Sequence, residues 1–212
     1  MSNISYVLGT LLLFVIGIVL IAVMPKASDS FKARIIIYIT TIIATFSGVF
    51  LAGWLNSVEQ TRASRQASLT MLGAALDDAG RLYATTQHDL SEREVWEPEE
   101  IASLGLGPAA AITFSDVALK GISPDIRRAF ITAVAITQQQ HVRLIGVAPN
   151  SKAFKGELTK YLADLGYLVA LLNIELDMDK QGWSLSDVRK KIIASQSERL
   201  KILDAERVDI KK

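Results

Sequence analysis

Two stretches near the N-terminus, residues 4–24 and 35–55, are strongly apolar and contain no charged side chain. Each is about as long as the roughly 20 residues that an α-helix needs to cross the hydrocarbon layer of a membrane. Pro25 ends the first stretch, and a short polar turn with three basic residues leads into the second. The sequence therefore predicts a membrane protein in which residues 1–55 form a two-helix transmembrane hairpin.

The flanking charges give an expected orientation for this hairpin. The first stretch is longer than the roughly 7–15 apolar residues of a signal peptide, which favours a retained helix. Lys26, Lys32 and Arg34 lie between the two stretches, whereas Arg62 and Arg65 follow the second. Because basic loops tend to stay in the cytoplasm, we expect a bacterial inner-membrane protein whose soluble part lies outside the cytoplasm.

Small side chains recur every four residues in the second stretch, at Ala44, Gly48 and Ala52. Small residues let helices approach closely in lipid, where van der Waals packing drives association. One interpretation is that this stripe packs against the first helix at Gly9 and Gly17. The alternative is that it contacts another subunit.

The rest of the chain is nearly neutral and contains no cysteine. Of the 23 basic and 22 acidic residues, 20 and 21 respectively lie after residue 58. This balance provides no electropositive surface, so we expect no nucleic-acid partner. The absence of cysteine excludes disulfides, thiol nucleophiles and cysteine-based metal sites.

Helical patterns are predicted on both sides of a mixed central region. Residues 56–108 are expected to be a membrane-proximal helical segment, and residues 184–212 a C-terminal helix that begins at Ser184 with Asp187 as its capping partner. Residues 77–100 are acidic, whereas the tail from residue 180 is basic. Such runs are usually solvated, although pairing between subunits is an alternative.

For residues 109–183 the sequence predicts a small α/β domain that contains a βαβ unit. Three apolar runs are expected to be strands, at residues 109–114, 141–147 and 167–176. Ser123 and Pro124 predict a helix start before the second strand. A second helix is expected to begin at Asn150 or Ser151 and to end at Gly166 before the third strand. The predicted fold class is therefore a transmembrane hairpin carrying a helix-rich α/β domain.

The loop between the last two predicted strands is the candidate ligand site. Gly146, Asn150, Ser151 and Lys152 would surround an anion at the N-terminus of a helix. Gly146 and Lys152 have the spacing of a phosphate-binding loop, but the second glycine of that motif is replaced by Ser151. We favour an ordinary turn over a nucleotide site.

Other motifs are incomplete, so we predict no catalytic residue, metal or cofactor. Asp177 and Asp179 match the first half of a calcium loop, but Val188 occupies the position of its bidentate glutamate. Arg81 and His88 have the spacing found in HEPN ribonucleases, but the surrounding segment is acidic, which disfavours RNA.

These features favour a non-enzymatic, membrane-anchored scaffold or interaction protein, acting as an oligomer or as a subunit of a membrane complex. Its expected partners are the lipid bilayer, further copies of itself or other membrane subunits. The alternative is a membrane effector or sensor that binds a small anion at residues 146–152. An enzyme assembled from distant residues at the membrane surface is the third possibility.

Overall fold

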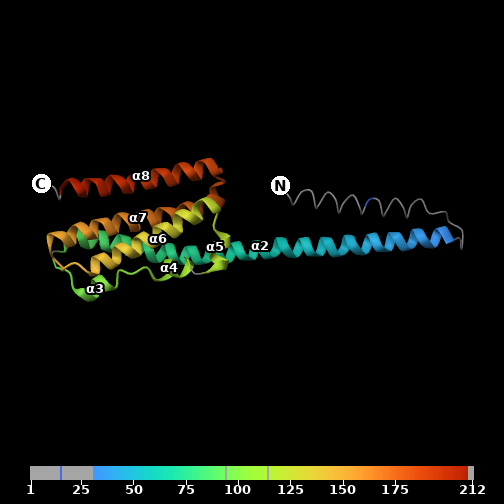
Figure 1. Cartoon of the computed structure of the whole chain (residues 1–212), viewed down its shortest axis with the longest axis horizontal. Helices are drawn as coiled ribbons and strands as arrows, with labels where there is room; N and C mark the ends of the chain where they lie inside the picture. Colours follow the sequence, from blue (N-terminus) through green and yellow to red (C-terminus); the bar gives the residue numbers. More distant parts are fainter. Residues whose placement is uncertain (1–14, 16–30, 94, 114, 210–212) are drawn as a thin grey trace. The chain divides into compact units, whose positions relative to one another are not determined.

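The computed structural model describes residue 15 and residues 31–93, 95–113 and 115–209, and all the regular secondary structure in this part is helical. The elements are α2 (Phe31–Glu92), α3 (Pro98–Ala102), α4 (Gly107–Thr113), α5 (Asp116–Gly121), α6 (Pro124–Ile145), α7 (Lys152–Gln181) and α8 (Leu185–Asp209) (Figure 1). The chain divides into two compact units, Met1–Ala63 and Ser64–Lys212, and α2 contributes residues to both.

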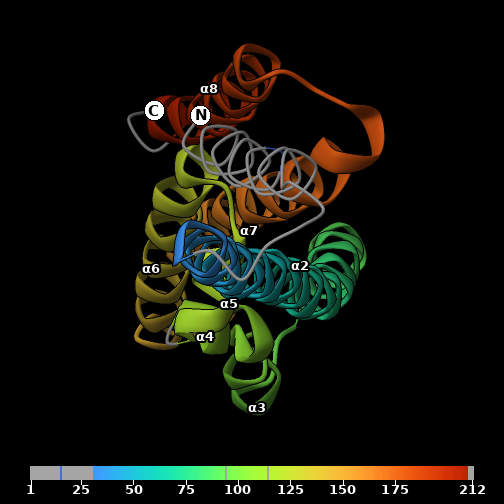
Figure 2. The same cartoon turned by 90° about the vertical axis from the view of Figure 1, so that its right-hand side faces the viewer.

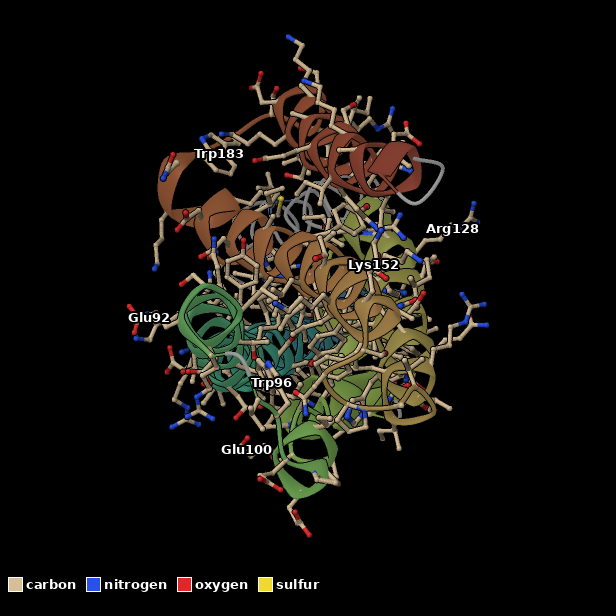
Figure 3. The ribbon with its side chains drawn as sticks, turned by 90° about the vertical axis from the view of Figure 1, so that its left-hand side faces the viewer. Glu92, Trp96, Glu100, Arg128, Lys152 and Trp183 are labelled. Carbon is tan, nitrogen blue, oxygen red and sulfur yellow. The ribbon has the colours of Figure 1, made fainter. Side chains whose placement is uncertain are left out.

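The second unit is a helical bundle with α7 at its centre. Seen end-on, α7 is surrounded by the C-terminal part of α2, by α6 and by α8 (Figure 3). This position explains why α7 is apolar on nearly all sides, since a helix enclosed by others has no face turned to water. Its fully buried side chains include Phe154, Leu158, Tyr161, Leu165, Leu168 and Leu171.

Three short helices, α3, α4 and α5, connect α2 to α6. They lie on the side of the bundle that is formed by α2 and α6, as Figure 2 shows. Each contributes an apolar side chain to the common core, namely Ile101 from α3, Ile112 from α4 and Ala118 from α5. These helices therefore close the bundle without any β-structure in the residues that the structure describes.

The predicted βαβ unit is wrong, because all three expected strands are helical. Residues 109–113 lie in α4, residues 141–145 form the last turns of α6, and residues 167–176 lie inside α7. Burial along α6 recurs every three or four residues, for example at Thr137, Gln140 and Leu144. A short apolar run does not distinguish a strand from a helix that is enclosed by neighbours, and here tertiary packing decided.

The α7 helix does not end at Gly166 as predicted. It continues to Gln181, and Gly182 ends it in a left-handed conformation with φ of 63°. The absence of a side chain at Gly166 instead allows Tyr83 of α2 to approach, because a Cβ there would lie 3.0 Å from the Tyr83 ring. Gly166 is therefore a contact between helices and not a helix terminus.

The predicted helix starts are confirmed. Pro124 opens α6, and the Ser151 hydroxyl caps α7 by accepting the backbone N–H of Phe154 at 3.1 Å. Before α8, the Ser184 backbone N–H donates to the Asp187 carboxylate, and the Asp187 backbone N–H donates to the Ser184 hydroxyl. These two reciprocal hydrogen bonds form a capping box. Local capping signals therefore identified helix starts, although they gave no information on helix length.

The predicted two-helix transmembrane hairpin is also overturned. Its second arm was expected to end at residue 55, but α2 extends from Phe31 to Glu92. Within the described residues, α2 is the one helix that is long and apolar enough to cross a membrane. The predicted first arm, with Gly9 and Gly17, lies outside the described residues apart from Val15.

Candidate functional site

The most distinctive surface of the described chain is the apolar part of α2. Residues 35–58 contain no charged side chain, and as a helix they span about 36 Å. Only 11% of the apolar window in this helix is buried, which argues against a core helix of a soluble bundle. The large exposed side chains here are Ile37, Tyr38, Ile39, Ile42, Phe46, Val49, Phe50, Leu51 and Leu55. Such a surface is suited to lipid.

Two hydroxyl groups within this surface are satisfied by the helix itself. Thr41 donates to the carbonyl of Ile37 at 2.9 Å, and Thr45 donates to the carbonyl of Thr41 at 2.8 Å. Hydroxyls bonded in this way do not need water, so they are compatible with a hydrocarbon environment.

The predicted small-residue stripe lies on an exposed face of α2. Ala44, Gly48 and Ala52 are all exposed, and a Cβ added at Gly48 would meet no atom within 4 Å. Two polar residues of this segment are buried, namely Thr40, four residues before Ala44, and Ser47, three residues after it. The use of the stripe in helix packing remains a prediction.

In the bundle, a buried carboxylate holds three helices together. Glu175 of α7 is 1% exposed and accepts a hydrogen bond from Arg65 of α2. It also accepts the backbone N–H of Ser123 at 3.1 Å and the Ser123 hydroxyl at 2.9 Å. Arg65 donates in addition to the carbonyl of Gly121 at the end of α5. This cluster joins α2, α7 and the connection between α5 and α6.

A second buried ion pair connects α7 and α8. Arg199 donates to the Asp164 carboxylate at 2.5 Å, and the two side chains are 15% and 5% exposed. Burial raises the pKa of Asp164 above its ordinary value, and the hydrogen bond from Arg199 opposes that rise. The pair therefore connects α8 to α7, although burying its two charges costs free energy of desolvation.

Sequence reasoning missed both carboxylates as structural residues. Their partners are distant in sequence, with Arg65 110 residues from Glu175 and Arg199 35 residues from Asp164. One signal was available, because Glu175 is the single charged side chain of the apolar run 167–176. A carboxylate in an apolar run needs a buried partner.

A polar cleft of about 320 Å³ lies between the end of α2 and α3. Its arginines are already paired: Arg81 with Asp78 at 3.1 Å, and Arg93 with Asp89 at 3.2 Å and with Glu100 at 2.7 Å. Hydrogen bonding to the Glu97 backbone and to Arg93 lowers the pKa of Glu100. These ion pairs connect α2 to α3. Since each carboxylate in them is already bound to an arginine, none is available as a general acid or base.

The predicted ligand loop is a turn between two helices. Gly146 follows α6 and not a strand, so the strand-to-helix context of a phosphate-binding loop is missing. The side chain of Asn150, which has φ of 65°, accepts the Trp96 backbone N–H at 2.7 Å. Of the four candidate residues, Ser151 caps α7 and Lys152 is exposed. Anion binding at this loop remains a prediction.

The remaining candidate motifs are placed on helices. Residue 177 and the following residues to Gln181 form the end of α7, so the incomplete calcium-loop motif lies on a helix and the loop expected there is not present. No group of three or more potential metal ligands occurs among the described residues. His88 lies 3.5 Å from Glu92 on an exposed face, and His141 is hydrogen bonded to the Ile101 carbonyl at 2.9 Å.

Comparison of the chain with protein-family models, with curated proteins and with solved structures finds no match in any of the three. The protein is described by its own structural features: it is a helical bundle in which one helix, α2, also carries a long, exposed apolar surface.

Proposed function

We propose that this chain is a membrane-anchored, non-enzymatic interaction protein that acts as an oligomer or as a subunit of a membrane complex. The observation that supports it best is the apolar surface of α2, where Val49 is 67% exposed and Phe46 is 63% exposed. Exposure of so many large apolar side chains to water would favour aggregation, whereas lipid covers them at no such cost. The lipid bilayer is therefore the first partner.

The buried charges of the bundle support a structural role over a catalytic one. Glu175 and Asp164 are each bound by an arginine and enclosed by helices. A catalytic carboxylate must reach a substrate, and these two are occupied in joining helices. These ion pairs fasten the helices of the bundle to one another, which supports a role in presenting surfaces to other proteins.

The flanking charges of the apolar segment support a position of the bundle outside the cytoplasm of a bacterium. Lys26, Lys32 and Arg34 precede the segment, and Arg62 and Arg65 follow it. The chain has no cysteine, so a Gln196→Cys variant in α8 can be labelled selectively in intact cells. Labelling by an impermeant maleimide supports the outside position, and labelling only after lysis contradicts it.

Membrane anchoring is tested by placing charge in the middle of the apolar surface. The full chain is expected in the membrane fraction and resistant to alkaline extraction. In a Phe46→Arg and Val49→Arg double variant, each arginine opposes insertion by about 2.5–3.5 kcal/mol, so this variant should be released. A Ser197→Arg variant on the exposed face of α8 is the matched control and should stay in the membrane. Release of the unaltered chain would refute the proposal.

A further inference from the structure

Two contacts between α7 and α2 establish which end of the bundle lies nearest to the apolar segment. The Glu175 carboxylate in α7 accepts a hydrogen bond from Arg65 in α2, and Gly166, earlier in α7, lies against the Tyr83 ring of α2. Residue numbers therefore rise along α7 as they fall along α2, so the two helices are antiparallel. Beyond Glu175, α7 continues for six residues to Gln181, about 9 Å in the direction in which α2 leads to its apolar segment.

This end of the bundle is close to the membrane if α2 is the membrane anchor. The charge-free segment of α2 ends at residue 58, seven residues before Arg65 within one continuous helix. Seven residues of helix span about 10 Å, nearly the distance by which α7 extends past Glu175. The headgroup layer adds about 5–8 Å on each side of the hydrocarbon. The connection between α7 and α8 is therefore expected at the level of the lipid headgroups.

Residues 180–191, here called the α7–α8 tip, form this end of the bundle. Leu185, the first residue of α8, is 60% exposed, and Trp183 is partly buried against the core. Figure 3 places Trp183 at the edge of the bundle. Side chains of a helix tilt toward its N-terminus, so those in the first turn of α8 are directed past the end of the bundle. A tryptophan beside an exposed leucine is suited to the boundary between lipid and water.

The charged groups nearest to Trp183 are suited to phosphate. Lys191 lies over the Trp183 ring, with its ammonium nitrogen 4.1 Å from the ring centroid. The α7–α8 tip contains four basic side chains and one acidic side chain, Asp187. The Asp187 carboxylate is engaged in capping α8, since it accepts a hydrogen bond from the Ser184 hydroxyl at 2.6 Å. The tip by itself is therefore positively charged.

Neighbouring segments reduce this positive charge without reversing it. Arg189 is paired with Asp125 of α6 at 3.2 Å, and Asp177 and Asp179 belong to the end of α7. Over the two segments at this end of the bundle, residues 116–128 and 177–191, there are seven basic and five acidic residues. Because this excess is small, we expect the apolar side chains to provide most of any contact with lipid and the lysines to favour its phosphate groups.

We propose that Trp183, Leu185 and Lys191 bind the phospholipid headgroup layer of the membrane that α2 enters. This inference rests on the proposed function and specifies how the bundle is held at that membrane. Leu185 enters the apolar edge of the layer, the Trp183 ring lies at the boundary with water, and Lys191 meets lipid phosphate. Attachment at two points, α2 and the α7–α8 tip, then limits rotation of the bundle about the axis of α2.

The contact is tested with a fluorescent reporter in the full chain, which has no native cysteine. Leu185→Cys is labelled with a dye whose emission shifts to the blue in lipid, and the protein is inserted into vesicles of phosphatidylcholine and phosphatidylglycerol. We expect a blue shift, weak quenching by iodide present on both sides of the vesicle, and strong quenching by a nitroxide on the lipid headgroup. Ile193→Cys, 61% exposed and eight residues further along α8, is the matched control and should remain in water.

Two results of this measurement would overturn the proposal. Equal iodide quenching at positions 185 and 193 would show that the α7–α8 tip stays in water. Protection of position 185 from iodide without quenching by the headgroup nitroxide would show that protein, and not lipid, covers the tip.

A charge substitution gives an independent test in which α8 keeps its fold. Leu185→Asp places a carboxylate in the first turn of α8, where the helix dipole favours negative charge. With the dye at Ser186→Cys, this variant should lose its protection from iodide several-fold, because lipid phosphate repels the carboxylate. Ile193→Asp in the same reporter protein is the matched control and should leave the protection unchanged. Equal protection in the Leu185→Asp and Ile193→Asp variants, with unaltered thermal unfolding, would reject the contact.

The inference and the proposed function fail in distinguishable ways. A chain that resists alkaline extraction while position 185 stays in water would reject the contact of the tip and leave the membrane anchor standing. Release of the unaltered chain by alkaline extraction would reject the anchor itself, and the contact with it.

Discussion

Arg199 in α8 donates a hydrogen bond of 2.5 Å to the carboxylate of Asp164 in α7, and both side chains are largely withdrawn from water. Since α8 packs mainly on α7, this pair is the principal polar connection of the last helix to the bundle. A second connection, between Arg189 and Asp125, lies at the surface, with side chains 64% and 31% exposed.

Removal of the buried arginine should therefore be far more costly than removal of the exposed one. Arg199→Ala leaves the Asp164 carboxylate buried without its partner, and we expect a loss of about 3 kcal/mol in the free energy of unfolding. Arg189→Ala breaks the exposed pair and should cost about 0–1 kcal/mol. Urea unfolding of the full chain in mild detergent measures both. Equal losses in the two variants would contradict a special role for the buried pair.

The Glu175 cluster predicts non-additive effects. Ser123 precedes α6, yet its hydroxyl makes no cap and donates to Glu175. Ser123→Ala should therefore cost about 1 kcal/mol through the lost bond between helices. Glu175→Gln should cost more, because it also removes the charge that Arg65 meets. In the double variant the loss should be smaller than the sum of the two, and strict additivity would argue against a shared hydrogen bond.

Two glycines are expected to respond in opposite directions to alanine. At Gly80, inside α2, an added Cβ meets no atom within 4 Å. Gly80→Ala should stabilise the bundle by about 0.5–1 kcal/mol, since alanine favours helix. At Gly121 a Cβ would overlap the Ser68 side chain, whose hydroxyl is bonded to the Ala118 carbonyl. Gly121→Ala should lower the midpoint of thermal unfolding, and an increase would show that Ser68 can move aside.

The capping box of α8 predicts a pH dependence. Hydrogen bonds from the Ser184 hydroxyl and backbone lower the pKa of Asp187. A carboxyl with a lowered pKa in the folded state adds stability above its unfolded pKa of about 3.9, and that stability is lost as the pH falls through the folded pKa. In a Ser184→Ala variant, the pKa of Asp187 should rise toward its ordinary value.

An NMR titration of the Asp187 carboxyl in the full chain measures this change. Glu100, whose lowered pKa depends on Glu97 and Arg93, is the internal control and should titrate as before. An unchanged Asp187 pKa in the Ser184→Ala variant would show that the hydroxyl is not the cause and would assign the shift to the backbone N–H of residue 184, which alanine retains, and to Lys190 and Lys191.

Helix starts were predictable from the sequence because capping is local. Ser151 caps α7 through a residue three positions away, and Ser184 and Asp187 do the same for α8. The apolar character of residues 35–55 was equally evident, because uncharged runs of this length are rare outside membranes and buried cores. Each of these inferences needed only neighbouring residues.

The strands and the hairpin were wrong because their assignment depended on the neighbours of each segment in space. Residues 167–176 are apolar because α2, α6 and α8 enclose α7, and an enclosed helix has the same composition as a buried strand. The partners of Glu175 and Asp164 were not evident from the sequence, since the arginines that bind them are distant along the chain. The sequence by itself determined the apolar segment and the helix starts. Only the tertiary structure decided helix lengths, the buried ion pairs and the side chains exposed at the α7–α8 tip, because burial is a property of the assembled helices.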